Sequence, residues 1–230
     1  MKQHHKRVSR LLSLVLCLAA VLSLAPAARA AAEPAQSTNI NRQDYTTYGS
    51  TVRSYLYVNS SGGLTRVEYT GSAVVAEDYD SSFHLAASRT LPMALPIWGG
   101  FFAGADANYL IFGQENRGEN SSQEVIRVVK YSKDWQEQGA ASIRGAYTQL
   151  PFEAGSLRCA EYGGYLYIHA ARQMFRNVMT MYGMMDTLAN HQANLTLEIR
   201  ESDMALVDSY DQVWNLDFGY VSHSFNQFIL

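Results

Sequence analysis

The sequence predicts an all-β domain made of about three and a half repeats of a four-stranded antiparallel unit. Three short runs centred on a tyrosine resemble one another, and each is followed by two strand-like segments that flank a turn. Almost no segment has the apolar periodicity of a helix. Strands that recur at a fixed period without helices are typical of an all-β repeat architecture.

The tyrosine-centred runs set the length of the repeat. They read SYLYVNSSGG, NYLIFGQENRG and GYLYIHAARQ, and their tyrosines are Tyr55, Tyr109 and Tyr165. Successive tyrosines lie 54 and 56 residues apart. We therefore expect each run to occupy the same strand of its unit.

A hairpin is expected after each run. The segments LTRVEYTGSAVVAEDYD, VIRVVKYSKDWQEQGAASI and NLTLEIRESDMALVDSYD each contain two strand-like halves. Turn-forming or charged residues separate the halves, and they begin at Tyr69, Ser132 and Arg200. Each unit therefore holds a run, a loop and a two-stranded hairpin.

A further strand precedes the second and third runs. GGFFAGAD and GSLRCAEYG each lead into a tight turn, which we place at residues 107–108 and 163–164. The unit then has four antiparallel strands in about 50 residues, the size of one β-propeller blade. We predict an open or incomplete β-propeller of about three and a half blades. An open β-sandwich and an α/β domain are the alternatives, and the scarcity of helical periodicity disfavours the latter.

Several runs resemble the diverged blades of secreted bacterial β-propeller proteins. The resemblance is carried by VVKYS and by GSLRCAEYGGYLYIH, and it covers roughly residues 50–230. It implies a scaffold that serves adhesion, ligand binding and catalysis in different members. It carries no catalytic motif, so site residues have to be identified by their chemistry.

Residues 1–30 have the pattern of a signal peptide. Basic residues precede the apolar run LLSLVLCLAAVLSLA, and Ala28 and Ala30 form an A-x-A cleavage pattern. The run is shorter than the roughly 20 apolar residues that span a bilayer, so we expect export without membrane insertion. We predict a flexible linker over residues 31–48, a partial propeller over 49–230, and a secreted or cell-surface location.

Removal of residues 1–30 makes the chain more acidic. Five basic residues and no acidic residue are lost, which moves the formal net charge from −3 to −8. Nucleic acids and anionic membrane surfaces bind basic patches, so we expect neither as a partner. Only Cys159 remains after cleavage, which excludes an intramolecular disulfide and favours a buried, inert thiol.

Acidic side chains are the candidates for catalysis. A glycoside hydrolase needs two carboxyl groups about 5–9 Å apart, and we name Glu161, Glu201 and Asp203 as candidates for such a pair. Glu77 and Asp78 lie in a second acidic run, AEDYD. Acidic residues in turns are ordinarily solvated, which is the structural alternative.

A methionine-rich insert supplies the candidates for metal binding. It separates the third tyrosine run from its hairpin and contains five of the eight methionines. Thioether ligands suit Cu(I), and Met179 and Met181 with His169 and His191 could form such a site. Methionine also fills irregular apolar gaps, and most buried polar groups are hydrogen-bonded to neighbouring strands. We therefore expect no cofactor and interpret the insert as a lid or a partner-binding segment.

The last residues, GYVSHSFNQFIL, predict the opening of a further unit. Residues 219–223 resemble a first strand, and residues 226–227 resemble its turn. An unpaired strand at a sheet edge favours association with another strand. We expect either missing C-terminal blades or self-association through this strand.

The function that the sequence favours is binding. We expect a secreted or cell-surface module, a fragment of a larger protein, that engages a glycan, a peptide or an envelope component through one face. The alternative is a glycan-active hydrolase on the same scaffold that uses the paired carboxylates. Binding is preferred because the sequence contains no nucleophile elbow, zinc-protease motif or phosphate loop.

Overall fold

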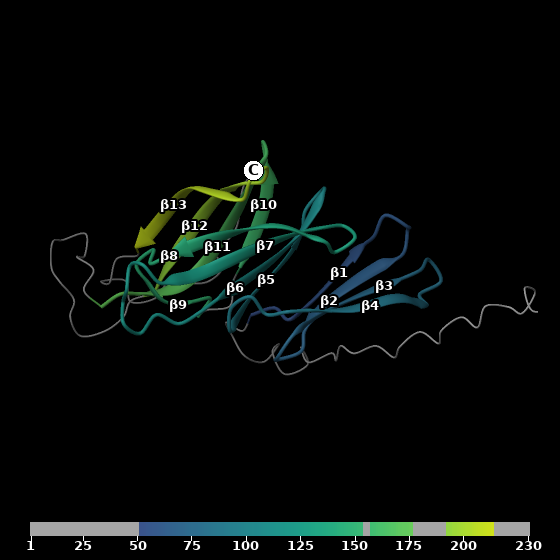
Figure 1. Cartoon of the computed structure of the whole chain (residues 1–230), viewed down its shortest axis with the longest axis horizontal. Coiled ribbons are helices and arrows are strands. Elements are labelled where there is room, and N and C mark those ends of the chain that lie inside the picture. Colours follow the sequence, from purple (N-terminus) through teal and green to yellow (C-terminus); the bar gives the residue numbers. More distant parts are fainter. Residues whose placement is uncertain (1–50, 154–156, 177–191, 214–230) are drawn as a thin grey trace, which may run out of the picture. The chain divides into compact units, whose positions relative to one another are not determined.

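The described part of the chain consists of strands, turns and loops. In a computed structural model of the whole chain, residues 51–153, 157–176 and 192–213 are described (Figure 1). These ranges contain thirteen strands and no helix, so the all-β prediction is confirmed. It follows that none of the described segments is a helix able to cross a membrane.

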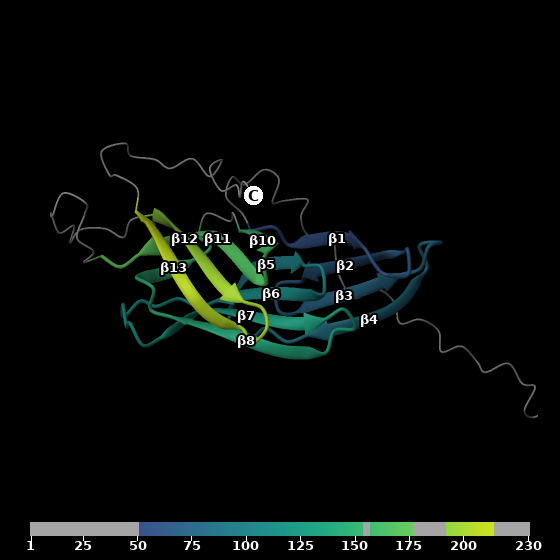
Figure 2. The ribbon, with the colours of Figure 1, turned by 90° about the horizontal axis from the view of Figure 1, so that it is seen from above.

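The first sheet has four antiparallel strands in sequence order (Figure 2). Alternate side chains of a strand point to opposite faces, and the register places Tyr57, Thr65 and Asp78 next to one another on one face. Its strands are β1 (Ser54–Val58), β2 (Leu64–Tyr69), β3 (Val74–Tyr79) and β4 (Leu85–Leu91).

The second sheet repeats this order. All seven residues of its second strand are buried, as expected for a strand that is covered on both faces. Residues 107–108, which were predicted as a turn, begin that strand, so this prediction is wrong by a few residues. The strands are β5 (Ile97–Ala103), β6 (Ala107–Gly113), β7 (Glu124–Ser132) and β8 (Glu137–Arg144).

One edge of the third sheet is made of two short strands. Its strands are β9 (Thr148–Pro151), β10 (Arg158–Tyr162), β11 (Tyr165–Met174), β12 (Gln192–Arg200) and β13 (Ala205–Val213). β10 pairs with residues 165–169 of β11 and β9 pairs with residues 172–174, while β12 and β13 follow on the other side. The turn at residues 163–164 is confirmed. Both of its glycines have positive φ, 61° and 84°, which glycine adopts without steric cost.

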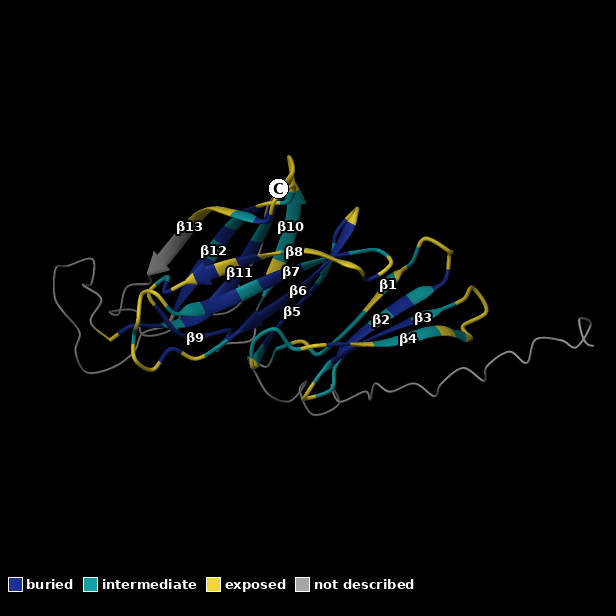
Figure 3. Cartoon of the chain, in the orientation of Figure 1, coloured by how far each residue is buried: buried dark blue, intermediate teal, exposed yellow. Residues whose placement is uncertain are grey.

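Two hydrophobic cores join the three sheets. The core between the first and second sheets, here called the first junction, is rich in aromatic residues such as Trp98 and Trp135. The core between the second and third sheets, the second junction, is mostly aliphatic and includes Ile168 and Leu197. The second sheet thus packs against both neighbours, and β6 is coloured as buried along its length in Figure 3. Each large apolar side chain that is fully buried contributes about 1.5–3 kcal/mol.

The turns between the third and fourth strands are alike in the three sheets. Each ends on a residue other than glycine with positive φ, and these residues are Phe83 (62°), Trp135 (64°) and Met204 (56°). In each sheet this residue lies four positions after the last residue of the third strand that pairs with the fourth strand. Positive φ is uncommon for bulky residues. The shared conformation therefore shows which strands of the three sheets correspond.

This correspondence corrects the predicted repeat. Tyr55 lies in the first strand of its sheet, whereas Tyr109 and Tyr165 lie in second strands. The expectation that the three runs occupy the same strand is therefore wrong for the first unit. The first and second strands of a unit share the same alternation and flank the same turn, so a tyrosine-centred run fits either one. The prediction of four-stranded antiparallel units is confirmed for the first two sheets, and the third sheet has the four strands with the additional short strand β9.

Several predictions concern residues outside the described ranges. They include the signal peptide over residues 1–30 with Ala28 and Ala30, the linker over 31–48, and the terminal strand over 219–223. Most of the methionine-rich insert, with Met179, Met181 and His191, also lies there. All of these stay predictions.

Candidate functional site

Two of the three predicted catalytic carboxylates lie together at the second junction. Glu161 is on β10, and Glu201 follows the last residue of β12. The Tyr109 hydroxyl donates a hydrogen bond to Glu201 Oε1 at 2.8 Å, and the Glu201 carboxylate lies close enough to Glu161 to affect its pKa. Glu161 Oε2 also accepts the backbone N–H of Ala105 at 2.7 Å. These contacts connect the second sheet to the third.

Gly104 allows the Glu161 carboxylate to reach the turn between β5 and β6. A Cβ atom at position 104 would lie 1.9 Å from Glu161 Oε1, which is closer than any real Cβ contact. Only glycine therefore leaves room for the carboxylate at this point of the turn.

The surroundings of Glu161 favour its protonated form. Burial is the main cause that raises the pKa of Glu161; the N–H of Ala105 lowers it, and the nearby Glu201 carboxylate raises it further. The pKa of Tyr109 is raised as well, first by burial and then by Glu201. Glu161 therefore keeps its proton to a higher pH than an ordinary glutamate does.

Both carboxyl groups are engaged by groups of the second sheet. Glu161 accepts the N–H of Ala105, and Glu201 accepts the Tyr109 hydroxyl. A glycosidase keeps its two carboxyls about 5–9.5 Å apart around the scissile bond, where they face the substrate. The contacts of Glu161 and Glu201 with the protein instead favour a structural role between two sheets.

Asp203, the third predicted carboxylate, does not join this pair. Its Oδ1 lies 3.5 Å from Arg200 Nε and accepts the N–H of Ala205 at 3.2 Å. Both charged side chains are about half exposed, so solvent screens the contact and it contributes little. Asp203 is a solvated turn residue.

His169 and Cys159 have structural surroundings. His169 is buried on β11, and its Nδ1 lies 2.7 Å from Thr196 Oγ1 on β12. Cys159 packs against the core of the second junction, and burial raises the pKa of its thiol. The described ranges hold no cluster of three or more metal-ligating side chains. The other three residues of the predicted copper site lie outside those ranges.

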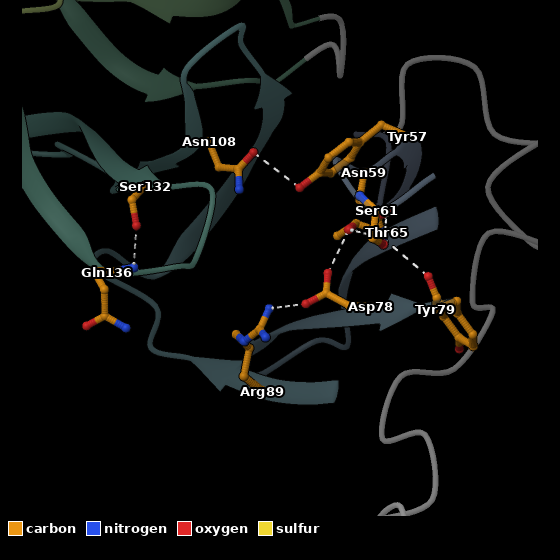
Figure 4. A network of polar contacts seen from close by, with 10 residues as sticks. All are labelled: Tyr57, Asn59, Ser61, Thr65, Asp78, Tyr79, Arg89, Asn108, Ser132 and Gln136. Atoms are coloured by element: carbon orange, nitrogen blue, oxygen red, sulfur yellow. Dashed lines mark hydrogen bonds and ion pairs between the residues drawn. The ribbon is translucent and has the colours of Figure 1, made fainter. Parts of the chain in front are cut away.

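A polar cleft of about 550 Å³ opens at the first junction. Tyr57, Thr65 and Asp78 line it from one face of the first sheet. Residues 103–105 and 133–134, in and beside two turns of the second sheet, line it from the other side. Figure 4 shows the Tyr57 side chain extending from the first sheet toward Asn108 of β6.

Asp78 and Asp134 are the acidic residues that line the cleft, and Asp78 is the one held on the face of the first sheet. Its Oδ1 accepts a hydrogen bond from the Thr65 hydroxyl at 2.6 Å, and its Oδ2 accepts one from Arg89 Nη1 at 2.7 Å (Figure 4). Charge-assisted hydrogen bonds of this kind are short and directional. They hold the carboxylate in one orientation while part of its surface faces the cleft.

Lys133 is the basic group of the cleft. Its Nζ donates to two backbone carbonyl groups at and after the β5–β6 turn and to Asn108 Oδ1, the last at 3.3 Å. The same ammonium lies 5.6 Å from the centroid of the Tyr57 ring, within the range of a cation–π contact. Burial lowers the pKa of Lys133, and the charges of Glu161 and Asp106 oppose that effect.

Two asparagines shape the cleft. Asn59 Oδ1 accepts hydrogen bonds from the backbone N–H groups of Ser61 and Gly63, which fixes the β1–β2 turn at the rim. Asn108 is fully buried; its Oδ1 accepts the Tyr57 hydroxyl at 3.3 Å, and its Nδ2 has no hydrogen-bond partner. Buried donors are rarely left unpaired. Asn108 thus holds Tyr57 and Lys133 in place beside the cleft, while its own Nδ2 is buried.

Sequence reasoning identified only part of this cleft. It named Asp78 as one of several acidic candidates and did not connect it with Tyr57 or Lys133. The run NSSGG after β1 was the available signal, because it predicts a tight hairpin that brings Tyr57 opposite Thr65. The approach of Lys133 depends on how two sheets pack, and no local pattern encodes that.

Comparisons with known proteins do not identify a family. No protein-family profile matches the chain, and no curated protein matches it. Among solved structures, the chain is similar to a crystal structure of a chimera of ACO and RPE65, with 9% sequence identity and a TM-score of 0.43. The match covers 70% of this chain and 38% of that chain, and at this level it carries no argument about fold or function.

Proposed function

We propose that the three sheets are blades of an incomplete β-propeller and that the domain binds a polar, hydroxyl-rich ligand, such as a glycan, in the cleft of the first junction. The propeller arrangement is supported by consecutive antiparallel sheets, two of four strands and one of four strands with the additional β9, that share cores with their neighbours. The matching turns at Phe83, Trp135 and Met204 add to it, because they recur once in each unit.

The cleft is the observation that carries the ligand proposal. Its volume of about 550 Å³ falls within the range of small-molecule sites. A carboxylate, an ammonium group, hydroxyl groups and an aromatic ring converge on it. A sugar presents both hydrogen-bond donors and acceptors and also an apolar C–H face, so this mixture of groups suits it. Because Asp78 and Lys133 are already held by hydrogen bonds, little side-chain ordering remains to be done on binding.

The location is part of the same proposal. Residues 1–30 have a signal-peptide pattern, so the domain would meet its ligand outside the cytoplasm, in secreted form or at the cell surface. Glycans and envelope polymers are abundant polar ligands in that setting, and a peptide is the remaining candidate.

The test is retention on a glycan array, followed by calorimetry with a retained glycan. We expect binding without release of reducing ends. Asp78→Asn should weaken binding about tenfold or more, since a hydrogen bond to a charged group contributes about 1.5–3 kcal/mol. The matched control is Asp208→Asn, an exposed carboxylate on β13. Equal binding by the Asp78 variant and the control would place the ligand elsewhere.

A glycan-active hydrolase is the second candidate. The raised pKa of Glu161 favours it, because a carboxyl group that keeps its proton can act as a general acid. The contacts of both carboxyl groups with the second sheet argue against it, since Glu161 accepts the N–H of Ala105 and Glu201 accepts the Tyr109 hydroxyl. Release of reducing ends that is lost in both Glu161→Gln and Glu201→Gln would establish the hydrolase, and it would displace the binding proposal.

A further inference from the structure

Two turns line the cleft of the first junction from its two sides. Residues 59–61 belong to the turn between β1 and β2 in the first sheet, and residues 104–105 belong to the turn between β5 and β6 in the second. The separation of these turns sets the width of the cleft at this end. The groups that hold each turn therefore also set the shape that a ligand meets.

The two turns are held in different ways. The β1–β2 turn is held from within, because Asn59 Oδ1 accepts the backbone N–H groups of Ser61 and Gly63. A turn of this kind keeps its shape without a neighbouring sheet. The β5–β6 turn is held by two side chains of other elements, Lys133 and Glu161.

Lys133 holds the β5–β6 turn by its carbonyl groups. Its Nζ donates to the carbonyl oxygen of Gly104, to that of Ala107 at 3.1 Å and to Asn108 Oδ1 at 3.3 Å. An ammonium group has three N–H donors, so these three acceptors can use all of them. The donors of Lys133 are thus committed to the wall of the cleft.

Glu161 holds the same turn by an amide group. It lies on β10 of the third sheet, and its Oε2 accepts the N–H of Ala105 at 2.7 Å. The carboxylate lies against the turn because position 104 is glycine, where a Cβ atom would be 1.9 Å from Glu161 Oε1. A carboxylate at the second junction therefore contacts a turn that lines the cleft of the first.

Lys133 and Glu161 hold the turn together. An ammonium group on its carbonyl oxygens and a carboxyl group on its N–H form charge-assisted hydrogen bonds, which are stronger than neutral ones. Their charges also influence each other. Burial lowers the pKa of Lys133, and the charge of Glu161 is the largest influence that opposes this effect. Loss of either side chain would leave the turn held from one side.

We propose that Glu161 is a positioning residue for the cleft: from the second junction it fixes the wall formed by residues 104–105 and so raises the affinity of the site for its ligand. The inference rests on the proposed binding of a glycan in that cleft. It gives Glu161 a role in binding that requires neither contact with the ligand nor catalysis. The two junctions are then linked through one turn.

The test is calorimetry with a glycan that the wild type retains on the array. Glu161→Ala removes the acceptor of the Ala105 N–H. We expect binding to weaken about three- to tenfold, less than a directly lost hydrogen bond to a charged group would give. The matched control is Lys130→Met, which removes a 2.8 Å hydrogen bond across the same junction, to the Glu201 carbonyl oxygen, that does not involve the turn. Urea unfolding checks that both variants are folded.

The outcomes separate this inference from the proposed function. A greater loss of affinity in Glu161→Ala than in Lys130→Met supports the positioning role. Wild-type affinity in Glu161→Ala, or an equal loss in both variants, overturns that role and leaves the proposed function standing. A wild type that binds no glycan overturns both.

The pH dependence of binding is the second measurement. The titratable groups that face the Glu161 carboxyl group are Tyr109 of β6, Lys133 after β7, Glu201 after β12 and Cys159 of its own strand. Ionised Glu161 is the stronger acceptor for the Ala105 N–H. The affinity of the wild type should therefore rise relative to that of Glu161→Gln, which cannot ionise, as the pH increases through the range in which Glu161 loses its proton. Parallel pH profiles of the wild type and Glu161→Gln would contradict the positioning role.

Discussion

The two junctions of the domain differ in one row of three residues that are paired across neighbouring strands. At the first junction Tyr57, Thr65 and Asp78 lie next to one another. Counted from the corresponding turns, the second sheet has Phe102, Tyr109 and Lys130 at these positions. The small Thr65 leaves a cleft in front of it, whereas the Tyr109 ring, stacked on Phe102 at 6.2 Å, extends across the second junction to Glu201.

The two junctions, although built from equivalent strands, therefore differ in their contacts. The second junction is bridged by hydrogen bonds from Tyr109 to Glu201 Oε1 and from Lys130 Nζ to the Glu201 carbonyl oxygen, both at 2.8 Å. A smaller pocket of about 430 Å³ lies beside this bridge. The first junction keeps its polar groups around open space. We infer that the second junction mainly stabilises the domain and that the first is available for a ligand.

Tyr109→Thr should have the largest effect on stability. It places threonine, which the first junction has at position 65, at the equivalent position of the second junction. Tyr109 is 1% exposed, so the change leaves a cavity and removes a hydrogen bond. We expect a loss of about 3–5 kcal/mol in the free energy of unfolding, as for other large-to-small changes of buried aromatic residues. Urea unfolding measures it. A decrease of less than about 1 kcal/mol in the free energy of unfolding would mean that the second junction is not tightly packed around Tyr109.

Removal of a single hydroxyl group is a finer comparison of the junctions. Tyr109→Phe loses a 2.8 Å hydrogen bond to a carboxyl group and leaves that carboxyl less satisfied, so we expect about 1–3 kcal/mol of destabilisation. Tyr57→Phe loses a 3.3 Å hydrogen bond to an amide, and we expect less than about 1 kcal/mol. The two variants control for each other in one set of urea unfolding curves. Equal losses would remove the distinction between the junctions.

The sheets could be predicted from the sequence because strand alternation and turn residues are local signals. The hairpin of the third unit and the glycine turn at residues 163–164 were found in this way. The correspondence of Phe83, Trp135 and Met204 was not found, since large residues with positive φ match no turn preference. Without it, Tyr55 was aligned with the wrong strand.

The sites could be predicted only as residue types. Carboxylates were selected for their chemistry, and Glu161 and Glu201 both contact the second sheet, whereas Asp203 is paired with Arg200 at a turn. The contact of Glu161 with the second sheet depends on Gly104, beside which its carboxylate lies. The cleft likewise needs Thr65 to be small at a position that faces another sheet. Contacts of this kind arise from packing between distant segments, and a single sequence does not specify them.

The pH dependence of stability should reveal the carboxyl pair, with the smallest effect of the three because Glu161 is only half-buried and solvent screens it. The folded chain raises the pKa of Glu161, so it binds this proton more tightly than the unfolded chain does. The resulting stabilisation is complete below the unfolded pKa, about 4.3, and is lost as the pH rises through the raised folded pKa. Glu161→Gln imitates the protonated form and cannot ionise.

The free energy of unfolding of the wild type should therefore fall relative to that of Glu161→Gln as the pH increases through this window. Urea unfolding at a series of pH values measures the difference, and Glu137→Gln, an exposed glutamate on β8, is the control. Its curve should run parallel to that of the wild type. If the Glu161→Gln curve is parallel as well, the proton is not held at the second junction. The hydrogen bonds of Tyr109 and Lys130 to Glu201 would then account for its closure alone.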